Sequence, residues 1–229
     1  MTQAKPFRKA PPQKLSRSSL GLVGTSMPDE FIDHTADFDD GLQNQFDRGR
    51  VVVFIDGANL FYAASHLGIE IDYAKLLQRL VGKAYLLHAF FYTGVDPDND
   101  KQHKFLLWMQ RSGFRVISKN VAQFPDGSRK ANLDVEIAVD MMRLSEHFDT
   151  AVLVSGDGDF AYVVNTLAYQ GVRVEVVGLR CMTSDQLISV ADCYIDIHSL
   201  KQQIQKLNLP SEDLYTPPVE LGSAGSVIA

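Results

Sequence analysis

The sequence predicts an α/β domain built on an open, mostly parallel sheet with helices on both faces. Two runs of β-branched and apolar residues, 51–55 and 151–154, are typical of strands buried on both faces. Stretches with the apolar spacing of helices follow each run. Because parallel neighbours need a crossover connection, this alternation favours a parallel sheet over a meander of hairpins.

The first half of the domain contains three strands and three helices. The run 51–55 ends at Asp56-Gly57, and a helical stretch follows it. Asp72 has the side chain of an N-cap, and Gly113 suits the end of a helix. The predicted strands are 51–55, 85–92 and 115–118, and the predicted helices are 59–67, a helix after Asp72, and 101–112.

The second half repeats the alternation after a loop that contains Pro125-Asp126-Gly127. The first helix of this half has an apolar stripe of Val135, Ala138, Val139 and Met142. The predicted helices are 130–147, 160–170, 184–190 and a terminal helix from Leu200, and the predicted strands are 151–154, 172–177 and an edge strand at 194–197.

Composition divides the chain into an arm at 1–48, a folded domain at 49–207 and a flexible tail at 208–229. In the arm, five basic residues come first, and the seven acids begin only at Asp29. Segregated charge with few aromatic or β-branched residues favours disorder. The basic part either contacts nucleic acid or is a solvated tail.

Bulk composition excludes several protein classes. The two cysteines, Cys181 and Cys193, have neither the CxxC spacing of a zinc knuckle nor the number needed for a disulfide framework. A net charge of −6 disfavours a general polyanion-coating protein but permits a local nucleic-acid groove. The sequence contains neither a membrane-spanning run nor a signal peptide, so we expect a cytoplasmic protein without a membrane partner.

Acidic residues follow the two most apolar strands. Asp56 ends the first, and Asp157 and Asp159 come directly after 151–154. Ligands of open α/β sheets bind at the carboxyl ends of the strands. The first turn of the predicted helix 130–147 brings Asp134 to the same rim, whereas Asp140 lies roughly 120° away around that helix.

Such a cluster of carboxylates points to a cation. Like charges repel strongly when they converge, and a hard divalent ion, Mg²⁺ or Mn²⁺, removes that repulsion. A metal held by carboxylates beside a phosphate suits phosphodiester hydrolysis. Each acid also has a plainer interpretation as a helix cap or a solvated residue, and Asp159 fits a cap before Phe160.

Other phosphate and metal motifs do not fit. A haloacid-dehalogenase phosphatase needs a second Asp at the position of Ala58. A calcium loop starting at Asp157 would need ligands where Ala161 and Ala168 stand. The first strand is followed by neither a P-loop lysine motif nor GxGxxG, which disfavours nucleotide-dependent ATPases and dehydrogenases.

Three ordered motifs resemble the NYN domain, specifically the bacterial LabA-like branch of the PIN-like nuclease superfamily. They are 54–60, 130–135 with Asp140, and 155–160, and the stretch 184–192 is similar too. The resemblance covers approximately residues 50–200. It implies a PIN-like domain with a Rossmannoid sheet, and an enzyme that cleaves RNA with Mg²⁺ or Mn²⁺.

Site roles follow from the same resemblance. The acids Asp56, Asp134 and Asp157 would bind metal and act in catalysis, with Asp159 as a fourth. Asn59 would position the first acid or contact a metal water or the substrate. Ser155 would support the turn at Asp157.

The segment 100–130 is the basic part of the domain, with seven basic residues and two acids. Arg129 and Lys130 begin the predicted helix that bears Asp134, so they are expected to bind phosphates of single-stranded RNA. Phe91, Tyr92 and Phe124 are candidates for base stacking, although core packing is the favoured role for Phe91.

The leading function is therefore a metal-dependent endoribonuclease acting on single-stranded RNA. The main alternative is a non-catalytic regulator that keeps the fold and binds RNA or protein. A nucleotide phosphatase using the same acids is a third class. A homodimer is expected from the resemblance alone, and further protein partners belong to the regulatory alternative.

Overall fold

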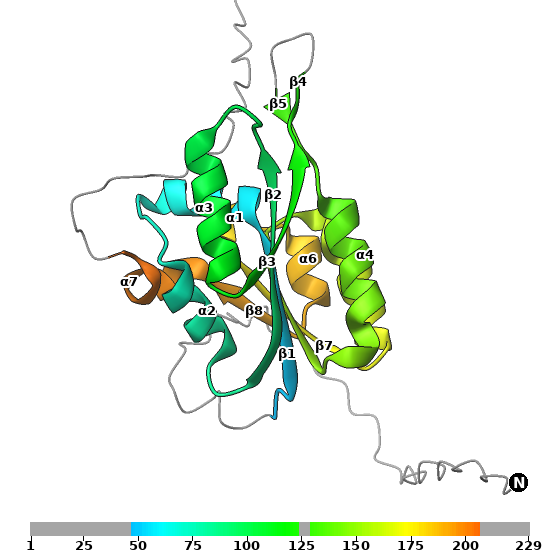
Figure 1. The fold of residues 1–229 in the computed structure, drawn as a ribbon. Coiled ribbons are helices and arrows are strands. Elements are labelled where there is room, and N and C mark those ends of the chain that lie inside the picture. Colours follow the sequence, from blue (N-terminus) through cyan, green and yellow to red (C-terminus); the bar gives the residue numbers. More distant parts are fainter. Residues whose placement is uncertain (1–46, 124–128, 207–229) are drawn as a thin grey trace, which may run out of the picture. The chain divides into compact units, whose positions relative to one another are not determined.

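The computed structural model describes residues 47–123 and 129–206, with the backbone alone at positions 123, 129 and 130. Within this part, six parallel strands form one sheet in the order β3-β2-β1-β6-β7-β8 (Figure 1). The strands are β1 (Arg50–Asp56), β2 (Tyr85–Val95), β3 (Phe114–Asn120), β6 (Thr150–Val154), β7 (Arg173–Gly178) and β8 (Cys193–Asp196). The predicted open parallel sheet is confirmed, and strand order reverses at β1.

Helices pack on both faces of the sheet, as predicted. One face carries α1 (Gly57–Leu67), α2 (Tyr73–Val81), α3 (Asp100–Arg111) and α7 (Lys201–Ile204). The other carries α4 (Asp134–Leu144), α5 (Ala161–Tyr169) and α6 (Asp185–Val190). Short 3₁₀ helices are η1 (Ser145–His147), η2 (Gly158–Phe160), η3 (Arg180–Met182) and η4 (Ile197–Leu200).

Strand β1 supplies side chains to both layers of the core. Val51, Val53 and Ile55 pack with the α1 side, and Val52 and Phe54 pack with the α4 side. All five are fully buried. Each such burial contributes about 1.5–3 kcal/mol relative to an exposed side chain, which explains why the central strand contains apolar residues without alternation.

Local signals set the helix ends. The Asp72 side chain accepts hydrogen bonds from the N–H groups of Ala74 and Lys75, so the predicted N-cap of α2 is confirmed. Gly113 follows α3 with φ of 92°, a left-handed conformation that glycine adopts without strain. The predicted helix stop therefore lies where the sequence placed it.

The start of α4 differs from the prediction. The helix was expected to begin at residue 130, but Arg129–Lys130 form β5, which pairs antiparallel with β4 (Ala122–Gln123). Helix α4 begins at Asp134 and ends at Leu144, before η1. The pairing of β4 with β5 satisfies backbone groups that a longer helix would have used, so a tertiary contact overrides the local helical pattern.

The predicted apolar stripe of α4 is confirmed for Ala138 and Met142, which are partly buried against the core, and wrong for its other two residues. Val135 is 70% exposed and Val139 is 55% exposed. Ile137 and Met141 are buried instead, next to Leu133. The sequence of α4 holds two apolar stripes, and only packing on the sheet decides which of them joins the core.

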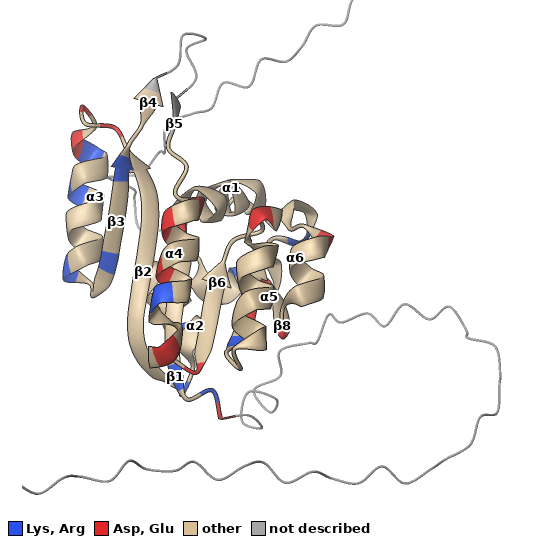
Figure 2. Ribbon diagram, turned by 90° about the vertical axis from the view of Figure 1, so that its right-hand side faces the viewer, with Lys and Arg blue, Asp and Glu red and all other residues tan. Residues whose placement is uncertain are grey.

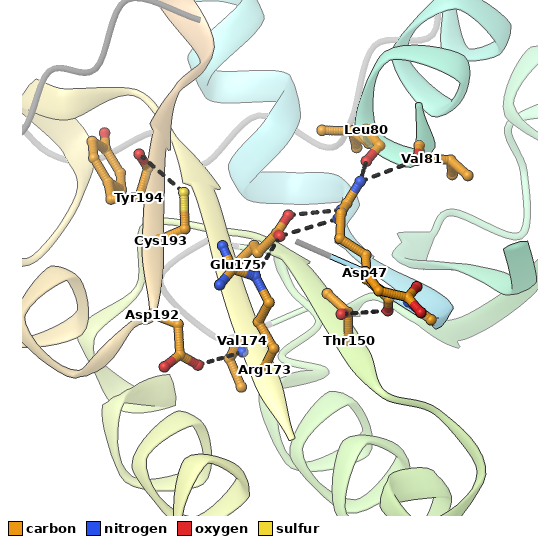
Figure 3. A network of polar contacts seen from close by, with 12 residues as sticks. Asp47, Leu80, Val81, Thr150, Arg173, Val174, Glu175, Asp192, Cys193 and Tyr194 are labelled. Carbon is orange, nitrogen blue, oxygen red and sulfur yellow. Dashed lines mark hydrogen bonds and ion pairs between the residues drawn. The ribbon is translucent and has the colours of Figure 1, made fainter. Parts of the chain in front are cut away.

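A buried ion-pair network joins the chain before β1 to β7 (Figure 3). Glu175 is 5% exposed, and it accepts from Arg48 at 2.7 Å and from Arg173 at 2.9 Å. Arg48 also donates to the carbonyl oxygens of Leu80 and Val81 at the end of α2. Arg48 thus binds the first described residues to the domain. It lies one position before residue 49, where the sequence predicted the domain to begin.

The remaining segment predictions concern other parts of the chain. Nearly all of the predicted arm 1–48 and the whole tail 208–229 lie outside the described residues. None of the helices in 47–123 and 129–206 combines the length and apolarity needed to cross a bilayer.

Candidate metal centre

The carboxyl ends of β1 and β6 and the start of α4 meet at one end of the sheet. Figure 2 shows acidic residues at the first turn of α4 and before α5 on this same end. One carboxylate oxygen each from Asp134, Asp157 and Asp159 lie within 4.8 Å of one another. Together with Asp56, these residues are called the acidic rim below.

Asp56 stands beside this group of three rather than within it. Its carboxylate caps α1 by accepting from the N–H groups of Ala58 and Asn59, both at 3.1 Å. The Ser155 hydroxyl donates to Asp56 Oδ2 at 3.1 Å and accepts from the N–H of Asp157 at 3.2 Å. The predicted support of the Asp157 turn by Ser155 is confirmed, and the same hydroxyl links Asp56 to that turn.

Asn132 orients Asp134 and was missed by the sequence analysis. Its side-chain Nδ2 donates to Asp134 Oδ2 at 2.7 Å, and its Oδ1 accepts from the N–H of Asp134 at 2.8 Å. These two bonds fix the carboxylate at the first position of α4. The sequence signal that could have revealed this role is the amide of Asn132 two residues before an acid at a helix start.

Asp157 and Asp159 have different local roles. Asp157 caps η2 by accepting from the N–H of Asp159 at 2.9 Å. Helix α5 begins after an apolar residue, Phe160. The capping role that was the alternative for Asp159 therefore belongs to Asp157, and the Asp159 side chain is exposed at the rim.

The turn before Asp157 is clamped from two sides. A Cβ at Gly156 would meet the carbonyl oxygen of Met182 and the side chain of Thr183, so only glycine fits. The Gly156 N–H donates to Asn59 Oδ1 at 3.0 Å, and its carbonyl accepts from the N–H of Ser184. Asn59 thus holds the acid-bearing turn, while its contact with substrate stays a prediction.

The acidic rim carries negative charge that the described basic side chains leave unpaired. Burial, helped by the charge of Asp134, raises the pKa of Asp56 to about 6, against the hydrogen bonds that it accepts. Burial also raises the pKa of Asp134, and the charges of Asp157 and Asp159 add to that shift. Among Lys and Arg side chains that the structure describes, none forms an ion pair with the rim.

The raised pKa of Asp56 leads to a stability prediction. The folded value of about 6 exceeds the ordinary 3.8, so ionised Asp56 destabilises the metal-free fold above pH 6, and this penalty fades toward pH 4. Asp56→Asn keeps a good helix cap and removes the charge. We expect it to raise the free energy of unfolding by about 2–3 kcal/mol at pH 7.5.

Urea unfolding in EDTA at pH 7.5 and pH 4.5 measures this effect. The gain should shrink to about a third at pH 4.5, where wild-type Asp56 is protonated in the folded state but still mostly ionised in the unfolded state. An equal gain at both pH values, or a loss at pH 7.5, would show that Asp56 is not held in an unfavourable ionised state.

The predicted helical position of Arg129 and Lys130 needs correction, whereas their contact with phosphates stays a prediction. The backbone of Arg129 and Lys130 lies in β5, so the expected first-turn position is wrong, and their side chains lie outside the described residues. Lys119, at the carboxyl end of β3, contacts Glu136 at 2.6 Å and the Asn132 carbonyl at 3.2 Å. The position of Lys119 at the carboxyl end of a strand is the sequence feature that could have placed it near the rim.

Arg180 lies on the other side of the rim. It belongs to η3, whose Met182 carbonyl faces Gly156, and it contacts Asp185 at 2.6 Å. Lys119 and Arg180 are therefore the described cations on the two sides of the clustered acids. Both are exposed enough to contact a phosphate.

Comparisons with known proteins agree with this arrangement. The NYN domain family model matches residues 50–200, which include the whole acidic rim. The chain is 32% identical over 182 residues to the low amplitude and bright protein LabA of Synechococcus elongatus, covering 76% of this chain and 97% of that protein. A crystal structure of a protein of unknown function from Vibrio parahaemolyticus has a TM-score of 0.59 and 27% identity, covering 66% of this chain and 94% of that one.

Proposed function

The chain belongs to the NYN domain family, in the LabA-like branch of the PIN-like superfamily, and from this premise we propose that it is a metal-dependent endoribonuclease acting on single-stranded RNA. The observation that carries the proposal is the convergence of three carboxylates within 4.8 Å, beside the half-buried Asp56. Family membership supports the nuclease class, and the acidic rim supports metal dependence.

The donor set fits Mg²⁺ or Mn²⁺. All of its ligand atoms are carboxylate oxygens, which hard divalent cations prefer. Asp134, Asp157 and Asp159 would hold the cation, and Asp56 would complete the negative field behind them. The raised pKa values of Asp56 and Asp134 support this assignment, because a bound cation would offset the repulsion between the charged forms.

The surrounding residues perform the positioning. A bound divalent cation supplies charge stabilisation at a phosphodiester and lowers the pKa of a water molecule. Asn132 orients the Asp134 carboxylate through a hydrogen bond. The Ser155 hydroxyl links Asp56 to the turn at Asp157, which fixes the position of each relative to the other. Lys119 and Arg180 would bind flanking phosphates, so the RNA backbone would cross the rim from the β3 side to the η3 side.

Incubation of the full chain with end-labelled single-stranded RNA tests the activity. We expect internal cleavage with Mn²⁺ or Mg²⁺, none with EDTA, and slower cleavage of the same sequence in a duplex. Release of inorganic phosphate from mononucleotides would instead indicate a phosphatase. Metal-independent cleavage would contradict the proposal, because the proposed chemistry requires a cation bound by the acidic rim.

The second candidate is a non-catalytic regulator that binds RNA or protein. The exposed valines of α4, Val135 and Val139, favour protein binding, because apolar surface beside a functional site commonly marks an interface. Binding without cleavage would support this candidate. The homodimer and the cytoplasmic location stay predictions, and light scattering of the purified chain measures the former.

A further inference from the structure

Two of the three aromatic residues that the sequence offered for base stacking, Phe91 and Tyr92, are buried. Phe91 is fully buried and Tyr92 is 1% exposed, so both belong to the core. Core packing, the favoured role for Phe91, is confirmed, and the prediction of base stacking by Tyr92 is wrong. Their place in β2, between the two helical layers, explains the burial. Phe124 lies outside the described residues. Stacking by Phe124 stays a prediction, and among the described residues an aromatic contact to RNA has to come from another element.

Tyr162 is an aromatic residue with the opposite environment. It lies in the first turn of α5 and is 84% exposed. Its neighbours Ala161, Val163 and Val164 are buried in the packing of α5 on the sheet. The helix therefore directs the Tyr162 side chain away from the core, where packing gives no reason for an aromatic ring.

Tyr162 is also close to the acidic rim along the chain. It follows Asp159 by three residues, a spacing that brings side chains onto the same side of a helical segment. Side chains of an α-helix lean toward its N-terminus, which for α5 is the end that bears the rim. The ring is thus placed on the Asp159 side of α5.

Charge alone provides weak attraction for RNA at this rim. Lys119 and Arg180 each have an acidic partner at 2.6 Å, Glu136 and Asp185, which offsets part of their positive charge. The rim itself repels phosphates until a cation binds. Stacking on an aromatic ring adds affinity that does not depend on charge and tolerates any base.

We propose that Tyr162 stacks on an unpaired nucleobase of RNA bound at the acidic rim. The inference rests on the proposed function and adds a reason for a preference for single strands. Bases within a duplex are already stacked on their neighbours, so they do not offer a face to the ring. An unpaired base next to a phosphate at the rim would turn outward onto Tyr162.

The same helix supplies a matched control. Tyr169 is the last residue of α5 and is 85% exposed, so its environment resembles that of Tyr162. Seven residues, or roughly 10 Å of helix, separate the two rings. A general effect of removing an exposed tyrosine would appear at both positions, whereas base stacking at the rim involves only Tyr162.

RNA binding in Ca²⁺, a hard cation that carboxylates bind and that offsets the repulsion of the rim, tests the proposal without requiring cleavage, and gel analysis of the same samples checks that the oligonucleotide stays intact. Fluorescence anisotropy of a labelled single-stranded oligonucleotide is measured with full-length wild type, Tyr162→Ala, Tyr162→Phe and Tyr169→Ala. We expect Tyr162→Ala to weaken affinity about 5- to 100-fold, the range for loss of one base-stacking ring. Tyr162→Phe and Tyr169→Ala should stay within roughly twofold of wild type, because the first keeps a stacking ring.

An abasic oligonucleotide of equal length separates bases from phosphates. Wild type and Tyr162→Ala should bind it equally, and the salt dependence of binding should be unchanged in Tyr162→Ala, since no phosphate contact is lost.

The proposal is overturned if Tyr162→Ala binds intact RNA like wild type, if Tyr169→Ala loses as much affinity as Tyr162→Ala, or if wild type binds no RNA. Cleavage with unaltered Tyr162→Ala binding would refute stacking alone, and a Tyr162 effect without any cleavage would refute the nuclease alone.

Discussion

Asp134→Asn is expected to reduce Mn²⁺-dependent cleavage of single-stranded RNA by about 10²–10⁴-fold, the range for removing one member of a catalytic unit. Asp134 belongs to the group of three carboxylates, and its charge also raises the pKa of Asp56. The substitution keeps the size of the side chain and an oxygen that can accept from Asn132. The expected loss therefore comes from the missing charge rather than from a misfolded helix.

Single-turnover cleavage rates at increasing Mn²⁺ concentrations measure this effect. Glu146→Gln is the matched control, because Glu146 lies in η1, beyond the opposite end of α4, and also loses one negative charge. It should cleave like wild type. Cleavage by Asp134→Asn within about twofold of wild type would remove Asp134 from the site.

The largest expected effect on stability comes from Arg48→Ala. Arg48 and Glu175 have side chains that are 11% and 7% exposed, and removing one partner of such a buried pair typically costs about 3–5 kcal/mol. Arg48 also satisfies the carbonyl groups of Leu80 and Val81. Arg173 still contacts Glu175, so we expect about 3 kcal/mol, the lower end of this range.

Arg50→Ala provides the comparison in the same assay. Arg50 pairs with Asp149 through side chains that are 47% and 52% exposed, and such exposed pairs contribute little to stability because water and salt screen them. Urea unfolding of both variants should therefore give clearly different losses. Similar losses would mean that the buried network does not hold the segment before β1 to the domain.

The sequence was informative where one physical constraint acted alone. Val51–Ile55 must be buried on both faces, so its composition identifies a central strand without reference to the rest of the chain. Strand ends of a parallel sheet lie at one edge, so Asp56 and Asp157 were predicted to converge before any contact was known. The three clustered acids of the structure all belong to the predicted set of four.

Prediction from the sequence was wrong where two local structures suited the same residues equally well. Helix α4 has apolar residues on two stripes, and the contact of the helix with the sheet selects Ile137 and Met141 rather than Val135 and Val139. Arg129 and Lys130 suit a helix start as well as a strand, and pairing with β4 decides for the strand. The partner of Arg48 is 127 residues away, a separation that no local pattern reveals.

Calorimetric titration of the metal-free full chain with Mn²⁺ tests the central claim, that the acidic rim is a metal centre. We predict saturable binding by wild type and binding at least about tenfold weaker by Asp134→Asn, since one ligand charge is lost. Circular dichroism should confirm that both proteins are folded. Equal affinity in the two proteins, or wild type that binds no Mn²⁺, would contradict the account.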